Sequence, residues 1–315
     1  MEQRLLIGLN AVLAAISADG PKVLCVERKG GWGLPFGQFD PSRHRTFEIG
    51  LRDFVKRQAS LPLGYVEQLY TFGDMGRESP RPSMANSDPS DRIVSIGYLG
   101  LSPEMAVSTR EKTAWRDWYD YFPWEDWRAG APPALSEIMT PLRQWANTPE
   151  RYGRLKASFG LDDILWEEER VLERYELMYE AGLVEEAVRD NKLSSTVTLP
   201  AGSGQTMISD HRRILATAIS RLRGKLRYRP IIFQMMPELF TLTALQASVE
   251  SVLGFEVHKQ NFRRSLETAK LVQKTENIAD TGGRPAALYR ASRLASERFA
   301  PGLTLPRLRE DKLPY

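Results

Sequence analysis

The stretch GWGLPFGQFDPSRHRTFEIGLRDFVKRQASL, residues 31–61, joins a glycine-rich loop to a run with helical periodicity. Its second half, FEIGLRDFVKRQ, carries four apolar residues that fall on one side of a helix. These residues are Phe47, Leu51, Phe54 and Val55. The pattern predicts a short amphipathic helix that packs by this side against its neighbours.

The sequence on either side of this stretch has the character of strands. Residues 6–28 contain two apolar runs that flank Asp19-Gly20-Pro21, a strong turn signal, and they predict a β-hairpin. Residues 65–72 and 93–101 predict further strands, with a polar loop rich in proline and serine between them. Together these elements predict a mixed α/β first domain over residues 1–145.

The composition is that of a folded globular protein. The 315 residues predict two domains, and 42% hydrophobic with 26% charged residues excludes a disordered chain. The single cysteine, Cys25, excludes an intramolecular disulfide and fits a reducing compartment. The N-terminus lacks a signal cleavage pattern, and no apolar run approaches the roughly 20 residues that span a bilayer. We therefore expect a cytoplasmic protein with no membrane partner.

Charge is distributed unevenly along the chain. The net charge of +3 combines +9 for residues 206–315 with −6 for the remainder. A basic domain joined to an acidic one predicts a polyanion partner for the basic part, and a solvated charged surface is the alternative.

An acidic helical segment with a linker occupies residues 146–205. Its apolar stripe comprises Leu161, Leu165, Leu172, Tyr175 and Tyr179. Such a stripe packs on its own domain or forms a subunit interface. The Ser-, Thr- and Gly-rich run at 193–206 predicts a linker.

Residues 206–315 predict several helices followed by a hairpin. Residues 211–228 form a basic amphipathic pattern, and residues 240–254 begin with Thr241 as a helix N-cap and end at Gly254. A short turn leads into HKQNFRRSLETAKLV, after which strand-like VQKTE and AALYR flank a loop. This order is that of a winged helix-turn-helix domain.

The helix expected within residues 258–272 carries polar groups that are predicted to read DNA. Phe262, Leu266 and Ala269 fall on the face that packs inward, which leaves polar side chains outward or near the N-terminal end. Arginine suits guanine, and asparagine and glutamine suit adenine. Further basic residues follow that suit phosphates. The predicted DNA-binding residues are Lys259, Gln260, Asn261, Arg263, Arg264, Lys270, Lys274, Arg284 and Arg290. A partner-binding helical domain with incidental basic residues is the alternative.

The stretch at 31–61 resembles the Nudix box, in which a glycine loop and a helix carry carboxylates around Mg²⁺. Gly37 matches the first glycine, but Arg43, Lys56 and Arg57 stand where the box has carboxylates. Asp40, Glu48 and Asp53 do not rebuild the site, because Glu48 and Asp53 each have an arginine four positions later and are expected to form ion pairs. The resemblance thus implies a Nudix-like α/β/α domain that binds a nucleotide without hydrolysis and without a catalytic or metal site, or a structural relic.

Two further regions resemble the NrtR and NadQ regulators of NAD metabolism. YVEQLYTFGD at 65–74 is similar to the segment after the Nudix helix, and QNFRR and RPAALYR are similar to their winged helix domain. The basic substitutions and the acidic helical segment look most like NadQ. The resemblance implies a homodimeric repressor of NAD biosynthesis or salvage genes that binds double-stranded operator DNA. It also implies an effector nucleotide, namely NAD, ATP or ADP-ribose, and no required cofactor.

The residues expected to hold that nucleotide are aromatic, amide and basic. Aromatic side chains stack on bases, an amide hydrogen-bonds to them, and basic groups meet phosphates. The candidates are Trp32, Phe36, Gln38, Phe39, Arg43, Lys56, Arg57, Tyr70 and Phe72. Core packing is the alternative for each aromatic residue. A Nudix-type hydrolase with an atypical metal site and a protein-interaction module are the competing functions.

Overall fold

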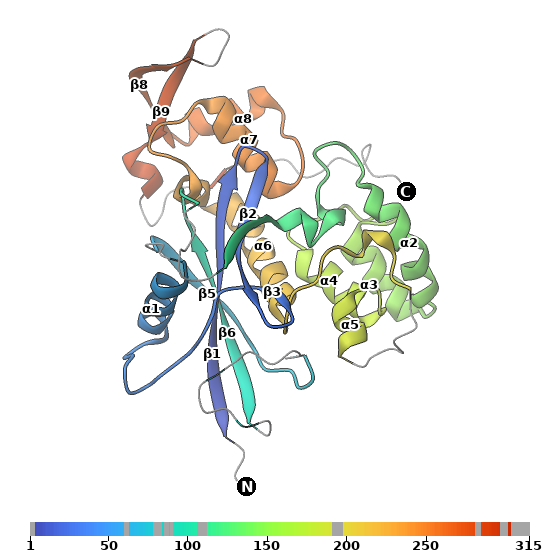
Figure 1. The fold of residues 1–315 in the computed structure, drawn as a ribbon. Helices are drawn as coiled ribbons and strands as arrows, with labels where there is room; N and C mark the ends of the chain where they lie inside the picture. Colours follow the sequence, from blue (N-terminus) through green and yellow to red (C-terminus); the bar gives the residue numbers. More distant parts are fainter. Residues whose placement is uncertain are drawn as a thin grey trace.

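The computed structural model describes residues 4–59, 63–77, 84, 88, 91–105, 112–190, 198–280, 285–296 and 302–303. A seven-stranded mixed sheet forms its centre, and Figure 1 shows β1 running through it. The strands are β1 (Leu5–Ser17), β2 (Gly20–Arg28), β3 (Gly31–Gly33), β4 (Phe36–Gln38), β5 (Tyr65–Phe72), β6 (Arg92–Leu101) and β7 (Thr113–Asp117). Their order is β3-β2-β1-β6-β5, with β4 on β1 and β7 on β2.

The predicted hairpin and strands are confirmed. The β1–β2 hairpin turns at Ala18 and Asp19, and Gly20, which begins β2, has a φ of 139°, a conformation open to glycine. β1 also runs parallel to β6 over ten residue pairs. The other strands of this sheet pair with β1, β2 or β6.

Two helices cover opposite faces of the sheet. α1 (Phe47–Ala59) packs on β1 and β4, and its buried Leu51, Phe54 and Val55 include three of the four predicted apolar positions. α6 (His211–Tyr228) packs on β1, β5 and β6 from the other face. The result is an α/β/α arrangement in which the second covering helix comes from a part of the chain far from the first.

A helical region lies between β7 and α6 in the chain, and Figure 1 shows it on the side of the view opposite α1. It comprises α2 (Pro133–Trp145), α3 (Pro149–Phe159), α4 (Val171–Glu180) and α5 (Glu185–Arg189). The expectation of helix over the whole acidic stretch is wrong for residues 161–170. Gly160 ends α3 in the left-handed conformation, and Asp162 also has a positive φ of 57°, so the chain turns before α4 begins.

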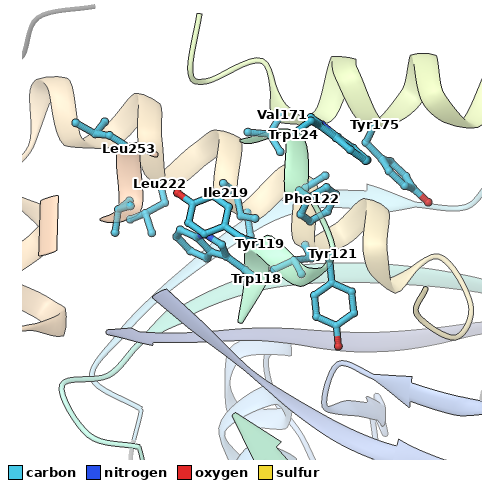
Figure 2. Close-up of a cluster of buried hydrophobic side chains, with 14 of the residues drawn as sticks. Trp118, Tyr119, Tyr121, Phe122, Trp124, Val171, Tyr175, Ile219, Leu222 and Leu253 are labelled. Carbon is cyan, nitrogen blue, oxygen red and sulfur yellow. The ribbon is translucent and has the colours of Figure 1, made fainter. Parts of the chain in front are cut away.

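An aromatic segment at 118–127 joins this region to the rest of the core. Figure 2 shows Trp118, Tyr119, Phe122 and Trp124 among side chains of α4, α6 and the end of α7. All four are buried. Burial of this many large aromatic rings is strongly stabilising, which makes the segment the centre of a core shared by the sheet, the helical region and the C-terminal helices.

The C-terminal part has the order predicted for a winged helix. α7 (Leu242–Leu253) and α8 (Lys259–Thr268) precede a hairpin of β8 (Val272–Ala279) and β9 (Ala286–Ala291). The backbone of Phe240 forms an isolated antiparallel bridge with Tyr289 of β9 through hydrogen bonds of 2.9 and 2.8 Å. Short 3-10 turns complete the described chain at 118–120, 123–125, 201–203, 231–235 and 293–296. Among the described helices, none has the length and apolar character of a membrane span.

Candidate DNA interface and nucleotide site

α8 presents a polar face to solvent. Phe262 and Leu266, four residues apart, are buried and anchor the helix on the core. Of the exposed side chains, five stand at predicted DNA-binding positions: Lys259, Gln260, Asn261, Arg263 and Arg264. Within the described part of the chain, these five form no hydrogen bond or ion pair. Their donors and acceptors are therefore available to an external partner.

The other predicted DNA-binding residues follow the helix onto the hairpin. Lys270 lies just past α8 with a φ of 51° and is exposed, and Lys274 is exposed on β8. Arg290 on β9 donates across the hairpin to the side-chain oxygen of Gln273, at 3.0 and 3.2 Å. Arg284 lies outside the described residues. Two of the basic groups that suit phosphates thus flank α8 on adjoining elements.

α7 begins and ends at the residues predicted from the sequence, and the turn between α7 and α8 is held by two side chains, Glu250 and Gln246, that were not identified from the sequence. Thr241 caps α7 by accepting from the backbone N–H of Ala244 at 3.0 Å, and Gly254 ends it with a φ of 83°, as predicted. Glu250 accepts from the backbone N–H of Val257 at 2.9 Å, and the amide of Gln246 donates to the carbonyl of Val257 at 3.0 Å. These bonds fix how α8 leaves α7.

The predicted nucleotide-binding aromatics lie at different places. Phe36 is buried beside Met84 and Ile93, and its backbone is clamped by the side chain of Gln58, which donates to its carbonyl at 2.8 Å. Phe39 packs edge-to-face on Phe47, with ring centroids 4.6 Å apart. Both rings take part in the packing of the loop and α1, and core packing was the alternative to nucleotide binding for each aromatic residue.

The other aromatic candidates stand at opposite edges of the sheet. Trp32 on β3 is half-buried under Arg116, whose guanidinium carbon lies 4.8 Å from the ring centroid. Tyr70 on β5 is 62% exposed, and Phe72 is buried facing α6. β3 and β5 end the strand order, so they are separated by about 19 Å at the usual strand spacing. One base stack cannot contain both Trp32 and Tyr70.

The polar residues predicted to bind the nucleotide lie on different elements from Tyr70 and Phe72. Gln38 is half-buried, and within the described residues its buried side-chain oxygen has no hydrogen-bond partner. Arg43, Lys56 and Arg57 are exposed around α1. The cations and Gln38 belong to β4, the following loop and α1, whereas Tyr70 and Phe72 belong to β5.

The carboxylates of the box region are paired, as expected for two of them. Glu48 pairs with Arg52 at 2.9 Å, and Asp53 pairs with Arg57 at 3.2 Å. Asp40 accepts hydrogen bonds from the hydroxyl and backbone N–H of Ser42, which hold its pKa below the usual range. No group of three or more metal-ligating side chains occurs in the described residues. The oxygens that a Mg²⁺ site needs are therefore engaged with arginine or serine.

A small cavity lies where α6 begins, against the sheet. Phe72 is the one nucleotide candidate that lines it. The other lining residues are Gly73, Asp74, Arg77, Ile93, Ser95, Ser209, Asp210, His211 and Ile214. No local pattern in the sequence predicts this cavity, because its residues come from β5 and the segment after it, from β6, and from the start of α6.

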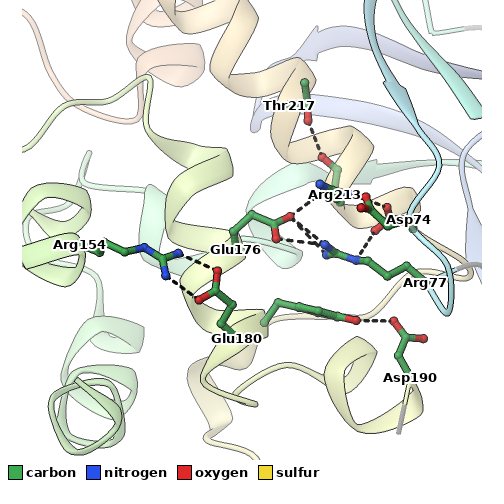
Figure 3. Close-up of polar contacts among 10 residues, drawn as sticks. Asp74, Arg77, Arg154, Glu176, Glu180, Asp190, Arg213 and Thr217 are labelled. Atoms are coloured by element: carbon green, nitrogen blue, oxygen red, sulfur yellow. Dashed lines mark hydrogen bonds and ion pairs between the residues drawn. The ribbon is translucent and has the colours of Figure 1, made fainter. Parts of the chain in front are cut away.

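An ion network borders this cavity (Figure 3). Arg77 pairs with Glu176 at 3.1 Å and with Asp210 at 3.3 Å, and Arg213 pairs with Glu176 at 2.8 Å and with Asp74. Burial raises the pKa of Asp210 to about 7, although the two arginines act in the opposite direction. The network joins the end of β5 to α4 and α6.

His211 fastens the start of α6 to the loop before β4. Its Nδ1 accepts from the backbone N–H of Leu34 at 3.0 Å. Burial, with smaller contributions from Arg189 and Arg28, lowers the pKa of His211 to about 3. The folded protein therefore holds this imidazole neutral at every pH where an exposed histidine takes up a proton.

This arrangement predicts an acid-dependent loss of stability. Because the folded-state pKa lies below the unfolded value of about 6.5, the unfolded state binds the extra proton and stability falls as pH falls below about 6.5. Between pH 7.5 and 5.5, the parent should lose roughly 1 kcal/mol more than His211→Asn, which keeps an acceptor for Leu34. Urea unfolding at both pH values measures the difference. Equal losses in parent and variant would show that His211 titrates normally in the fold.

A groove of about 680 Å³ lies between the β1–β2 turn and the winged helix. Ile16 and Gly20 line it from the hairpin, and Met235, Phe240 and Ala244 line it from the other side. Arg128 also borders it and is held by Asp126 through two hydrogen bonds of 2.8 Å. Beside the groove the winged helix meets the sheet directly where α7 contacts β2, and the two parts also meet through α6 and the aromatic segment.

Comparison with known proteins identifies the C-terminal part. Residues 232–291 match the model of the NrtR DNA-binding winged helix domain. A repressor from Acinetobacter baylyi, described as the ADPR responsive transcriptional repressor NtrR, is 35% identical over 128 residues. That alignment covers 40% of this chain and 51% of the relative, so the chain spans about half the length of the relative it matches.

Solved structures share the whole fold. Shewanella oneidensis NrtR complexed with a 27mer DNA has a TM-score of 0.57 at 21% identity, covering 94% of this chain and 99% of that one. A MutT/nudix family protein from Enterococcus faecalis has a TM-score of 0.51 at 16% identity, covering 93% and 88%. The predicted fold class, a Nudix-like α/β/α domain, a helical region and a winged helix-turn-helix domain, is confirmed. The resemblance to NrtR-like regulators is supported as well.

Proposed function

We propose that this chain is a nucleotide-responsive transcriptional repressor of NAD biosynthesis or salvage genes that binds operator DNA as a homodimer. The observation that carries this proposal is the exposed face of α8. Its five polar side chains have no partner among the described residues, and the helix stands second in a segment that matches a DNA-binding winged helix domain. A surface of unpaired donors and acceptors on a recognition helix is suited to base edges.

The polar residues have separate roles in this proposal. Arg263 and Arg264 suit bidentate contacts to guanine, and Gln260 and Asn261 suit adenine. Lys270, Lys274 and Arg290 lie beyond the helix and on the hairpin, where they suit phosphates and fix the register of the protein on the duplex. Sequence specificity would come from α8, and non-specific affinity from the flanking basic residues.

Selection from a random double-stranded library tests the DNA-binding role. We expect the full-length protein to enrich sites with two-fold symmetry, because a homodimer presents two α8 helices. The half-sites should lie about 10 base pairs apart or at a multiple of that spacing. Failure to enrich any sequence over several rounds at fixed salt would contradict sequence-specific binding.

We infer that the α/β domain holds the effector. The Acinetobacter relative responds to ADP-ribose by its description, which makes ADP-ribose the first probe, with NAD and ATP as alternatives. The exposed Arg43, Lys56 and Arg57 lie on α1 and on the loop that follows Gln38 of β4, and although Arg57 also pairs with Asp53, their positive charge suits the phosphates of any of the three. The domain boundary is proposed after α6, near residue 230, because α6 covers the sheet and the matched winged helix begins at residue 232.

The proposal includes binding without hydrolysis. We expect no release of AMP from ADP-ribose or NAD in the presence of Mg²⁺, because Glu48 and Asp53 are paired with arginines and Lys56 and Arg57 repel a divalent cation. Calorimetry should also give the same nucleotide affinity with and without EDTA. Mg²⁺-dependent AMP release that grows with protein concentration, and is lost with EDTA, would favour the hydrolase instead.

A further inference from the structure

A buried carboxylate joins three parts of the molecule. Glu125, in the aromatic segment, is 1% exposed and binds two arginines. Arg174 on α4 donates to both of its oxygens, at 2.5 and 2.9 Å. Arg223 on α6 donates to one of them at 2.6 Å. Both arginine side chains are fully buried, and among the described residues Glu125 is the carboxylate that pairs with each of them.

The remaining donors of Arg223 reach the end of α7. Its Nε donates to the carbonyl of Val252 at 2.9 Å, and a terminal nitrogen lies 3.2 Å from the hydroxyl of Tyr119. That hydroxyl donates to the carbonyl of Ser251 at 2.6 Å. The network defined by Glu125, Arg174, Arg223 and Tyr119 therefore ends on the last turn of the helix that precedes α8.

This contact sets the position of α7. The last carbonyls of a helix have no partner within the helix, and a cation at that end also interacts favourably with the helix dipole. Here the carbonyls of Ser251 and Val252 are satisfied by Tyr119 and Arg223. Gly254, with a φ of 83°, packs so closely that an added Cβ would overlap the carbonyl oxygen of Glu125. α7 cannot shift without breaking buried hydrogen bonds.

The same two helices that hold Glu125 reach the sheet. α4 contributes Glu176 and α6 contributes Arg213 to the ion network at the end of β5 (Figure 3). α6 contacts the sheet as far along as Lys225, which pairs with Glu67 of β5, and it also contacts α7. A displacement of α4 against α6 at the sheet would separate Arg174 from Arg223, the two groups that share Glu125.

We propose that the network of Glu125, Arg174, Arg223 and Tyr119 couples nucleotide occupancy of the α/β domain to the orientation of α8. The inference rests on the proposed function and assigns its regulation to these residues. Buried charges need one specific arrangement to satisfy every donor, so this network converts a small helix shift into a discrete change at α7. The signal then passes to α8 through the turn held by Glu250 and Gln246.

Two mild substitutions in the full-length protein test this role. Tyr119→Phe removes one hydroxyl, and Glu125→Gln keeps the shape of the side chain without its charge. The measured quantity is the ratio of DNA Kd values with and without saturating ADP-ribose, NAD or ATP, on a duplex selected by the parent. Nucleotide affinity is measured separately by calorimetry. In both variants we expect this ratio to lie at least about threefold closer to 1 than it does in the parent, because coupling free energies of this kind are modest. The nucleotide affinity of each variant should stay within about twofold of that of the parent.

Matched controls come from the same helical region outside the network. Tyr152→Phe removes a hydroxyl that bonds to Asp162, and Glu180→Gln removes a charge paired with Arg154. Both should keep the parent ratio. If Glu125→Gln fails to fold, Tyr119→Phe decides. A parent that responds to nucleotide together with a folded Tyr119→Phe variant that responds equally overturns the coupling role alone, whereas a parent whose DNA affinity ignores all three nucleotides overturns the proposed function.

Discussion

Replacing Glu125 with alanine should lower the free energy of unfolding by about 3–5 kcal/mol, because it leaves two arginines buried without a counter-charge. Arg174 and Arg223 have no solvent exposure through which water could take the place of the carboxylate. The change also leaves a cavity among large aromatic rings. Urea unfolding at pH 7.5, followed by tryptophan fluorescence, measures the loss.

The matched comparison is the pair of Arg154 and Glu180 on the surface of the helical region. This pair has two hydrogen bonds of 2.7 Å, but its side chains are 45% and 38% exposed. Glu180→Ala should therefore cost less than about 1 kcal/mol. A loss for Glu125→Ala no larger than that for Glu180→Ala would show that water enters the site and that the buried network does not hold the helices together.

Replacing Arg264 with alanine should weaken binding to the selected DNA by about 1–3 kcal/mol, a factor of roughly 5–150 in Kd. Arg264 is exposed on α8 and has no partner within the described residues, so its loss leaves the fold intact. A bidentate contact to guanine discriminates between bases, and the variant should also tolerate a changed base at one position of each half-site. Fluorescence anisotropy at fixed salt measures both effects.

Lys274→Ala is the comparison for this variant. Lys274 lies on β8 of the hairpin, where we expect a phosphate contact. Its removal should weaken binding to selected and random DNA by similar factors and reduce the salt dependence. If Arg264→Ala binds selected DNA as tightly as the parent does, the assignment of α8 as the reading helix is wrong.

Local signals in the sequence predicted much of the fold. Turn residues at 19–21 placed the hairpin, and apolar spacing placed α1 and α8, because each element is specified by its own residues. Thr241 and Gly254 marked the ends of α7 for the same reason: a side-chain cap and a left-handed residue act within one turn. The exposed face of α8 followed directly from the buried positions of Phe262 and Leu266.

Long-range polar contacts could not be predicted in this way. Glu125 lies 49 residues from Arg174 and 98 from Arg223, and no periodicity links them. The sequence also placed α6 with the DNA-binding part because it is basic. Three of its charged residues, Arg212, Arg223 and Lys225, are instead buried and form ion pairs within the core. Composition reports charge but not where a charge is neutralised.

The candidate nucleotide site shows a similar limit. Trp32 and Tyr70 both lie near the box region in the chain, but the strand order separates β3 from β5. The order depends on β6 inserting beside β1, a pairing between distant segments that the sequence does not reveal. Gln38 on β4 and the three cations on the following loop and α1 come from one continuous part of the chain. The strand order therefore does not separate these predicted nucleotide-binding residues from one another.

The most direct test of the account is the affinity of the full-length protein for its selected DNA with and without nucleotide. Fluorescence anisotropy would be run at one salt concentration with ADP-ribose, NAD and ATP in turn, and with scrambled DNA as the reference. We expect tight binding to the selected duplex alone, and a change of about 5–150-fold in Kd with one of the nucleotides. Binding that is equal on both DNAs and indifferent to all three nucleotides would contradict it.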